Sequence, residues 1–465
     1  MSAKIFTVKR SEIEGRLDPI YYIRKNELVG YKHLKLEKIG KHFFVKDGDH
    51  DKLPDDAVSD ENNGFRYLRA QDLKENKIIS EKPIYVTKKY FESVRRCHIY
   101  PNDLLFSIMA SVGATAVVPK NFSICTANRA VGILRAKDEV VFLPEYVQVV
   151  LNTELGIKLL ELQKRGGIQQ RVNLDDISNL ELPVFDFEKQ RKIIDFYNSA
   201  LSQKEQKQEQ AKKLLASIDS YLLSELGITL PQKDNSLSKR IFTTKFSEVT
   251  GGRLDPVFNN EYFKEVEKSF QSKYKLYQLK LLANTIFQGC GQDLTEEKSK
   301  KLLKVKNIQT GNIIDYDDIE NIREIPKSKI LMSGDIISPF IGEAIRQIKF
   351  SVFYTPIKNY EWTVDNNTGV IRINEKIADS YFIAEVLNSS IGELQIEKLI
   401  SGGGVPFIGA NNAKKLLIPL PPLPKQKEIA GYIRSIRAQA KQLQAEAEQI
   451  MQDAKHQVEK MILGE

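Results

Sequence analysis

The stretch PLPPLPKQKEI, residues Pro419–Ile429, packs four prolines into six residues and then continues into a charged and apolar run. Proline fixes φ and disfavours the helical conformation in the residue before it, so these prolines form a stiff lead-in. From Ile429 onward apolar residues recur at alternating steps of four and three, which predicts a long helix with one apolar stripe. This stripe, here called the seam of the helix, consists of Ile429, Ile433, Ile436, Ala440, Leu443, Ala447, Ile450 and Ala454.

A diverged copy of the same motif, PVFDFEKQRKI, begins 236 residues earlier at Pro183 (419 − 183 = 236). At the same shift VLNTELG, beginning at Val150, matches VLNSSIG, beginning at Val386. GRLDPIY at Gly15 matches GRLDPVF at Gly252 with a shift of 237. Several ordered matches at nearly one shift predict an internal duplication. Each copy is expected to be a mixed globular unit of roughly 185 residues followed by a long helix.

The first helix has an equivalent seam that is apolar at its ends and polar in its middle. A helix of about 35 residues is about 50 Å long, and it needs a partner to bury such a stripe. The other helix of the same chain is the obvious partner, and an oligomerisation coiled coil is the alternative. The seam positions of the first helix are Ile193, Tyr197, Ala200, Lys204, Lys207, Ala211, Leu214 and Ile218.

The globular segments show strand-like alternation at AVGILRA and GVIRIN, with turns rich in glycine and asparagine. Each copy also has one long amphipathic stretch before its glycine-rich loop: FLPEYVQVVLNTELGIKLLELQ in the first and DSYFIAEVLNSSIGELQIEKL in the second. The predicted fold class is therefore mixed α/β. Two repeated globular α/β domains are expected to be joined by two long antiparallel helices that form an intramolecular coiled coil with pseudo-two-fold symmetry.

The bulk composition bounds the class of protein. A chain of 465 residues with 42% hydrophobic residues suits two or three globular domains. No apolar run approaches the roughly 18 residues that span a membrane, and the N-terminus lacks the apolar stretch of a signal peptide. The three scattered cysteines lack metal-ligand spacing and favour a reduced, cytoplasmic location. A net charge of +8 fits a polyanionic partner.

With these features together, the chain resembles the specificity subunits of type I restriction-modification systems. In that family PLPPLxxQxxI opens each helical region, as at Pro419–Ile429 and, degraded, at Pro183–Ile193. The segment Asn102–Ala136 resembles a second family pattern, of which SGDIISPFIGEA is the shorter counterpart in the second copy. The resemblance implies target recognition domains at 1–186 and 241–420, and helical spacer regions at 187–240 and 421–465.

The resemblance also implies the function. Each recognition domain would read one half of a bipartite target in double-stranded DNA, and the helices would set the spacer and dock two methyltransferase subunits. Motor-nuclease subunits would join for restriction. The chain itself would need no cofactor, and S-adenosylmethionine is expected on the methyltransferase subunit. A duplicated protein–protein scaffold that does not bind DNA, with helices that recruit partner enzymes, is the alternative.

The motifs of an enzyme are missing from the sequence, which agrees with a non-catalytic subunit. There is neither an Asn/Asp-Pro-Pro-aromatic methyltransferase loop nor a phosphate-binding GxxxxGK[ST] loop, and QGCGQD at 288–293 lacks a dinucleotide-binding frame. Cys125 is expected to be a small buried thiol rather than a nucleophile. No metal site is predicted.

Candidate DNA contacts are the arginine, lysine and amide side chains of the globular segments, because these pair efficiently with base edges. In KRGGIQQR, 164–171, direct contact and a helix C-cap with solvated polar residues both stay open. The DNA-binding candidates are Arg66, Arg69, Gln71, Arg95, Arg96, Arg129, Arg165, Gln169, Gln170, Arg171, Lys304, Lys306, Asn307, Gln309, Arg346, Gln347, Lys349 and Tyr360.

Three further expectations concern single features. Trp362 is expected in the core rather than stacked on a base. The repeated RLDP is expected to pair its arginine and aspartate across a turn. The candidate partner-binding residues on the helices are Ile193, Tyr197, Ile218, Ile429, Ile433, Ile436, Leu443 and Ile450.

Overall fold

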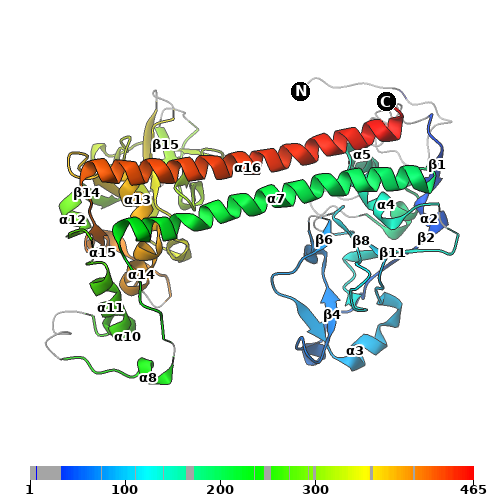
Figure 1. Cartoon of the computed structure of the whole chain (residues 1–465), viewed down its shortest axis with the longest axis horizontal. Coiled ribbons are helices and arrows are strands. Elements are labelled where there is room, and N and C mark those ends of the chain that lie inside the picture. The colour runs from blue at the N-terminus through cyan, green and yellow to red at the C-terminus, as the bar shows by residue number, and fades with distance from the viewer. Residues whose placement is uncertain are drawn as a thin grey trace. The chain divides into compact units, whose positions relative to one another are not determined.

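The structure is a computed structural model that divides into two compact units (Figure 1). Unit 1 comprises residues 1–208 and 444–465, and unit 2 comprises residues 209–443. The two long helices, α7 (Phe187–Leu226) and α16 (Leu423–Leu463), each contribute residues to both units. The residues described are 7, 33–74, 76–109, 112–139, 141–163, 172–234, 236–245, 253–271, 273–291, 293–296, 300–356, 360–401 and 404–465.

Unit 1 is built on a four-stranded antiparallel sheet whose strands occur in the order β2-β11-β8-β9. Its core face carries Leu104, Phe106 and Leu134, all fully buried together with residues of the helices that follow. The alternation in AVGILRA is thereby confirmed as a strand, β11. The bounds of the strands are β2 (Phe43–Asp47), β8 (Leu104–Ser107), β9 (Thr115–Val117) and β11 (Val131–Ala136).

A second sheet in unit 1 has the order β10-β4-β7-β3, with β10 parallel to β4 and the other pairs antiparallel. Two further antiparallel pairs are β1 with β12 and β5 with β6. These strands are β1 (Leu36–Lys38), β3 (Val58–Ser59), β4 (Phe65–Leu68), β5 (Leu73–Lys74), β6 (Lys77–Ile78), β7 (Ile84–Val86), β10 (Thr126–Ala127) and β12 (Glu181–Pro183). The helices are α2 (Ile39–His42), η3 (Asp55–Ala57), η4 (Ala70–Asp72), α3 (Lys88–Ser93), η5 (Arg95–Cys97), α4 (Pro144–Leu151), α5 (Glu154–Gln163) and α6 (Leu174–Ser178).

Unit 2 has a four-stranded antiparallel sheet in the order β14-β22-β19-β20, and a three-stranded sheet β18-β15-β21 in which β15 and β21 are parallel. The strands are β13 (Leu276–Gln278), β14 (Ala283–Gln288), β15 (Lys300–Leu303), β16 (Ile308–Gln309), β17 (Ile313–Ile314), β18 (Glu320–Asn321), β19 (Ile336–Pro339), β20 (Ser351–Val352), β21 (Glu361–Val364), β22 (Thr368–Ile373) and β23 (Leu417–Pro419). The helices are α8 (Leu237–Arg240), α10 (Pro256–Asn259), α11 (Glu261–Ser269), α12 (Leu279–Leu282), η6 (Val305–Asn307), η7 (Lys327–Lys329), η8 (Glu343–Gln347), α13 (Ser380–Asn388), α14 (Ser390–Leu399) and α15 (Gly409–Ala413).

The two units contain strands of the same kinds in the same order. The sheet β2-β11-β8-β9 in unit 1 corresponds to β14-β22-β19-β20 in unit 2, and the parallel pair β4 and β10 corresponds to β15 and β21. The mixed α/β class predicted from the sequence is confirmed within the described residues. GVIRIN lies on β22, also as predicted.

Each predicted amphipathic helix is in fact two helices. In unit 1 the chain breaks between α4 and α5, and in unit 2 between α13 and α14. A Cβ atom on Gly156 would lie 2.2 Å from the Val150 carbonyl oxygen, and one on Gly392 would lie 2.0 Å from the Leu387 carbonyl oxygen. These breaks therefore need a glycine, which explains why VLNTELG and VLNSSIG match.

Candidate nucleic-acid interface

Each long helix is attached to its unit by one buried glutamine near its start. Gln426 is fully buried. Its Nε2 donates to the carbonyl oxygens of Pro421 (2.8 Å) and Ile377 (3.4 Å). Its Oε1 accepts from the Asp379 backbone N–H at 2.9 Å. The side chain thus ties the first turn of α16 to the loop that leads into α13.

Gln190 does the same for α7. It is fully buried, and its Nε2 donates to the carbonyl oxygens of Val141 (2.6 Å) and Phe185 (2.8 Å). Its Oε1 accepts from the Leu143 backbone N–H at 2.9 Å. Gln190 and Gln426 are 236 residues apart (426 − 190), so the signal was present in the matching phrases EKQRKI and PKQKEI. From the sequence, the fixed start of each helix was attributed to the prolines alone, and the glutamine was missed.

The lead-in to each helix is a short strand. Pro183 ends β12, which pairs with β1, and Pro419 ends β23, which pairs with β13. Both prolines stand at the end of a two-stranded pair, where the missing N–H costs no ladder hydrogen bond. The chain therefore enters each helix from a strand fixed to the same unit.

In unit 1 the seam of α7 packs against the C-terminal part of α16. Ile193, Tyr197 and Ala200 share one core with Ala454 and Val458. The polar middle predicted for this seam carries ion pairs. Lys204 lies 3.7 Å from Glu448, and Lys207 lies 2.5 Å from Glu446.

In unit 2 the C-terminal part of α7 shares the core with the start of α16, including Ile218, Leu222, Ile429 and Ile433. Lys425 is paired with Glu225 at 2.8 Å and with Glu428 at 2.7 Å. Hydrogen bonds to Glu225 and Glu428 raise the pKa of Lys425 above its usual range. The 4-3 spacing read from the sequence thus matches the buried positions of both helices.

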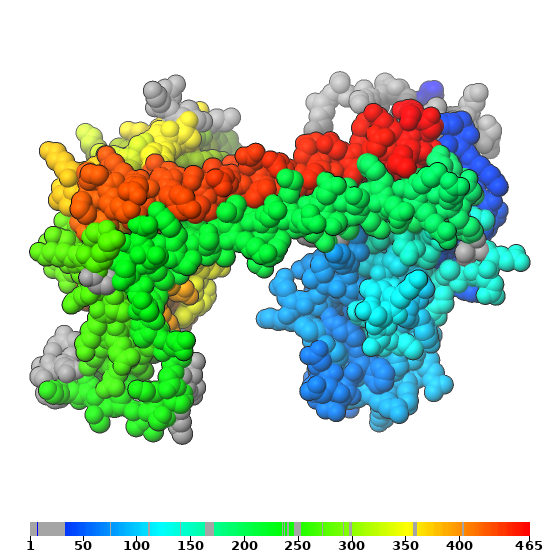
Figure 2. Space-filling view, in the orientation of Figure 1, coloured from blue at the N-terminus to red at the C-terminus, as the bar shows by residue number. Residues whose placement is uncertain are grey.

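This packing corrects the partner-binding candidates. Ile193, Tyr197, Ile218, Ile429, Ile433 and Ile436 are at most 7% exposed, and Leu443 and Ile450 are half-buried. Because they are buried against the chain itself, these six side chains are not available to a separate subunit. The other side of each helix is open to solvent, and Figure 2 shows long stretches of both helices at the surface.

Several arginine candidates of unit 1 lie at the C-terminal end of the parallel pair β4 and β10. Arg69 directly follows β4, and the N–H of Asn128, next to Arg129, donates to the Leu68 carbonyl oxygen. Arg95, Arg96 and Arg129 are exposed. Arg96 also donates to the Gly48 carbonyl oxygen at 3.2 Å and lies 3.4 Å from Asp47.

Arg69 is engaged within the protein. Its guanidinium lies 3.3 Å from the buried carboxylate of Asp72 and donates to the Lys82 carbonyl oxygen at 3.1 Å. In the amide orientation that satisfies both groups, the Gln71 oxygen accepts from Arg69 Nη2 at 3.0 Å. Arg66 is half-buried over the Tyr85 ring, 5.4 Å from its centroid. Arg165, Gln169, Gln170 and Arg171 lie outside the described residues.

Most unit 2 candidates are also held by the protein. Asn307 is 2% exposed and caps η6, like Asp72 in η4, and donates to the Asp317 carbonyl oxygen at 3.3 Å. The sequence predicts Asn307 as a base contact, but its amide is buried and hydrogen-bonded within the protein. Each of the following has a partner in the protein: Lys304 with Glu320, Lys306 with Asp318, Gln309 with the Lys306 carbonyl oxygen, Arg346 with Glu343, and Tyr360 with Lys301. Gln347 is exposed and Lys349 is half-buried.

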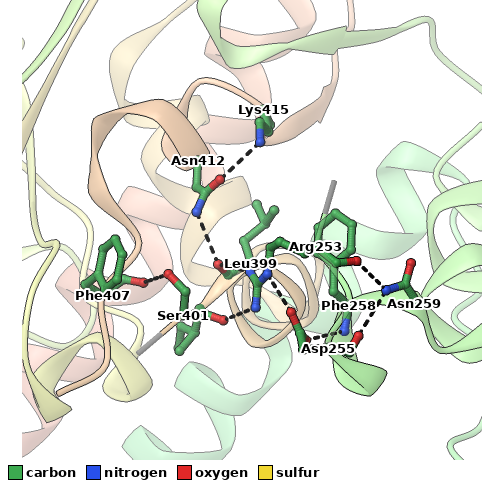
Figure 3. Close-up of polar contacts among 10 residues, drawn as sticks. Arg253, Asp255, Phe258, Asn259, Leu399, Ser401, Phe407, Asn412 and Lys415 are labelled. Carbon is green, nitrogen blue, oxygen red and sulfur yellow. Dashed lines mark hydrogen bonds and ion pairs between the residues drawn. The ribbon is translucent and has the colours of Figure 1, made fainter. Parts of the chain in front are cut away.

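The RLDP motif of the second copy joins α10 to the C-terminus of α14 through Arg253 and Asp255, and this set of contacts is here called the clasp (Figure 3). Arg253 Nε is 2.7 Å from Asp255, which confirms the predicted pairing in this copy. The same guanidinium donates to the carbonyl oxygens of Leu399 and Ile400, both at 2.8 Å, and so caps the C-terminus of α14. Asp255 in turn accepts from the Phe258 N–H and caps α10. The RLDP of the first copy, Arg16–Pro19, lies outside the described residues.

We expect Arg253→Met to destabilise unit 2 by about 2 kcal/mol, because two charge-assisted hydrogen bonds to carbonyl oxygens are lost. Hydrogen exchange of the amides that follow α14, such as those of Ser401 and Phe407, should accelerate, since these two residues close the adjacent loop with bonds of 2.9 and 2.8 Å. Arg346→Met, which removes an exposed arginine of the same unit, is the control. Equal exchange in both variants would contradict the clasp.

No catalytic constellation emerges among the described residues. Cys125 is fully buried, and burial raises the pKa of its thiol to about 12, so the expectation of a buried thiol is confirmed. The described residues contain no group of three or more His, Cys, Asp or Glu that could hold a metal ion. Trp362 is 4% exposed in the core of unit 2, as predicted. No helix in the described part of the chain is long and apolar enough to span a membrane.

Comparison with known proteins finds a family match for part of the chain. Residues 45–216 match the family described as "Type I restriction modification DNA specificity domain". The specificity subunit of the EcoKI type I restriction enzyme of Escherichia coli K12 is 30% identical over 154 residues. That match covers 32% of this chain and 32% of the relative, so it spans about a third of the relative's length. Residues 45–216 thus match a DNA specificity domain of type I restriction-modification systems, which supports the resemblance seen in the sequence.

One solved structure shares the fold at a TM-score above 0.5. This structure, described as the structural basis of complex assembly and conformational transition of the type I restriction-modification system, has a TM-score of 0.54 at 15% identity. The match covers 92% of this chain and 97% of the solved chain. The HsdS subunit of Thermoanaerobacter tengcongensis has a TM-score of 0.39 at 15% identity, covering 93% and 97% of the two chains.

Proposed function

We propose that this protein is the DNA-recognition subunit of a type I restriction-modification complex, in which unit 1 and unit 2 each carry a domain that reads one half of a bipartite target. The observation that carries the proposal is the match of residues 45–216 to the type I specificity domain, together with the same strand order in unit 2, which lies mostly outside that match. Two domains built alike on one chain suit a target of two separate half-sites.

The helices are proposed to form an antiparallel intramolecular coiled coil that sets the spacer between the half-sites. The support is the burial of both seams at 4-3 spacing and the attachment of each helix by a buried glutamine. A helix of 40 residues is about 60 Å long. That length corresponds to about 18 base pairs of duplex at 3.4 Å each. A rod of this size can hold two domains at separate places along DNA. The duplication, its pseudo-two-fold symmetry and the predicted domain boundaries stay part of this proposal.

Partners and cofactor follow from the same proposal. Two methyltransferase subunits would dock on the solvent-exposed sides of the helices, and motor-nuclease subunits would join for restriction. S-adenosylmethionine would be bound by the methyltransferase subunit and not by this chain, which acts by binding and placing DNA. The expected location is the cytoplasm.

Among the DNA candidates, Arg95 and Arg129 are proposed as the leading contacts of unit 1. Both are exposed, and neither guanidinium has an ion pair or hydrogen-bond partner among the described residues. Arg69 is proposed to act indirectly, by holding the turn after β4 through Asp72. The DNA contacts expected of Arg66, and of Arg165, Gln169, Gln170 and Arg171, stay predictions.

We expect Arg95→Ala or Arg129→Ala to weaken binding at one half-site by about 1–3 kcal/mol if the side chain contacts a base, with unfolding unchanged. A pure phosphate contact would weaken all sequences alike and lower the salt dependence. Arg69→Ala is the contrast: it should lower the free energy of unfolding of unit 1, because the buried Asp72 carboxylate loses its ion-pair partner. If all three variants lowered the free energy of unfolding equally, Arg95 and Arg129 would be structural residues rather than DNA contacts.

The function itself is tested by methylation. Methylated positions in genomic DNA are compared between strains with and without the gene, and the purified chain is tested for DNA binding with and without an added type I methyltransferase subunit. The expected result is a bipartite methylated motif that disappears with the gene. An unchanged methylome, or assembly without salt-sensitive DNA binding, would instead favour the scaffold.

A further inference from the structure

The turn of the β16–β17 hairpin lies against the long helix of unit 2. Gly311 and Asn312 form this turn with positive φ angles of 80° and 61°. A Cβ atom on Gly311 would lie 2.8 Å from Arg437 Nη1, so glycine lets the turn approach the arginine of α16 closely. The hairpin therefore contacts a helix that follows it by more than a hundred residues.

A buried ion pair fastens this contact. Glu385 of α13 is 1% exposed, and it accepts from Arg437 Nη2 at 2.7 Å and from Arg437 Nε at 3.2 Å. Asn312 Nδ2 donates to the same carboxylate at 3.1 Å, and its Oδ1 accepts from the Val352 N–H at 2.7 Å. A bidentate arginine–carboxylate pair fixes both position and orientation. Three elements, the hairpin, α13 and α16, are joined at one carboxylate.

Unit 1 has an equivalent contact between a hairpin turn and a long helix, but different side chains make it. Asn76, in the turn of the β5–β6 hairpin, has a φ of 64° and donates to the Tyr197 hydroxyl of α7 at 2.8 Å. Gln148 of α4 donates to the Asn76 carbonyl oxygen at 3.0 Å. Asn76 and Asn312 are 236 residues apart (312 − 76), the shift of the whole repeat. A hairpin turn thus touches the long helix in both units, through a neutral pair in one and an ion pair in the other.

A helix held only at its start can pivot about that point. Gln426 and Arg437 are 11 residues apart on α16, or about 16 Å, and Gln190 and Tyr197 are seven residues apart on α7, or about 10 Å. Two attachments at such separations fix the direction of the helix relative to its unit as well as its point of entry. Each hairpin attachment includes one buried polar side chain, Glu385 in unit 2 and Tyr197 in unit 1, and directional bonds resist tilting better than apolar packing alone.

We propose that the hairpin turns are second anchors, and that Arg437, Glu385 and Tyr197 are positioning residues that hold each recognition domain at a fixed angle to its helix. The angle determines how strictly the spacing between the two half-sites is read. This inference rests on the proposed DNA-reading function and names the part of the fold that regulates its spacer selectivity. The bases read within each half-site do not depend on these residues.

The test uses the full complex with its methyltransferase subunit and DNA duplexes that keep both half-sites but vary the spacer by one base pair either way. Arg437→Met with Glu385→Gln removes both charges together, so no unpaired charge stays buried. We expect its methylation rate on the native spacer to fall no more than a few-fold. The preference for the native spacer over its neighbours should fall about tenfold, and discrimination against half-site mismatches should not change.

Two further variants make the outcome decisive. Tyr197→Phe removes only the hydroxyl that Asn76 binds, and should relax spacer preference in the same direction even if the double variant folds poorly. Arg434→Met is the control: it removes an exposed arginine from the same helix, next to the Tyr381 ring, without touching the hairpin.

Unchanged spacer preference in Tyr197→Phe and in a folded double variant would overturn the inference, as would an equal loss of half-site discrimination. A wild-type complex that methylates no bipartite site would instead overturn the proposed function.

Discussion

Replacing Gln426 by leucine is expected to destabilise unit 2 by about 3–5 kcal/mol, because three backbone groups lose the fully buried amide that bonds them. The Asp379 N–H and the carbonyl oxygens of Ile377 and Pro421 would each lose this hydrogen bond, and leucine offers none in its place. Losses above about 4 kcal/mol are exceptional for one substitution and arise from such unsatisfied groups.

The single tryptophan makes this measurable by unit. Trp362 is 4% exposed and lies in unit 2, so its fluorescence follows the unfolding of unit 2 in urea. Gln426→Leu should move the Trp362 transition to lower urea. Gln190→Leu should destabilise unit 1, detected by circular dichroism, and leave the Trp362 transition nearly in place. Lys427→Ala, an exposed neighbour of Gln426, is the control. A Trp362 transition that moves equally in Gln426→Leu and Lys427→Ala would show that the buried amide does not anchor the helix.

The helices and their seams could be predicted from the sequence because the signal is local and periodic. Alternating steps of three and four place side chains on one face of a helix wherever it lies. The strands β11 and β22 could be predicted for the same reason. The breaks at Gly156 and Gly392 could not, since the close approach of each glycine to a carbonyl oxygen is a property of the folded chain.

The polar candidates were harder to assign because a sequence does not show which charged groups the protein itself uses. Arg253 bonds to carbonyl oxygens about 146 residues away, and Lys207 pairs with Glu446, 239 residues away. Asn307 and Arg69 were predicted to contact bases, but both take part in capping short helices within the protein. Hydrophobic periodicity marks a buried face, whereas nothing local distinguishes an arginine that reads DNA from one that caps a helix.

Lengthening both helices by seven residues is expected to lengthen the preferred spacer by about three base pairs and leave the half-sites unchanged. Residues 202–208 of α7 and 444–450 of α16 would be duplicated, at the positions where the two units divide. The duplicated segments contain the partners Lys204 and Glu448 and Lys207 and Glu446, so the new turns pair with each other in register. Seven residues add about 10.5 Å, and each base pair rises about 3.4 Å.

The geometry of the duplex predicts how active the lengthened protein will be. Three base pairs turn the second half-site by about 100° around a duplex of 10–10.5 base pairs per turn, so one added repeat should reduce the methylation rate. Three added repeats supply about 31.5 Å, or roughly nine base pairs, which brings the second half-site back near its original face. The longer variant should therefore be faster on its own best spacer than the shorter one.

Methylation of duplexes with graded spacers measures both effects. Duplication in α7 alone is the control: it leaves the helices unequal in length and should abolish activity on every spacer. If the fully lengthened proteins kept the native spacer, the coiled coil would not set the distance. If their half-site sequences changed, the domains and the helices would not be separable parts. If neither outcome is observed, the helices set the distance between the half-sites independently of the domains that read their sequence.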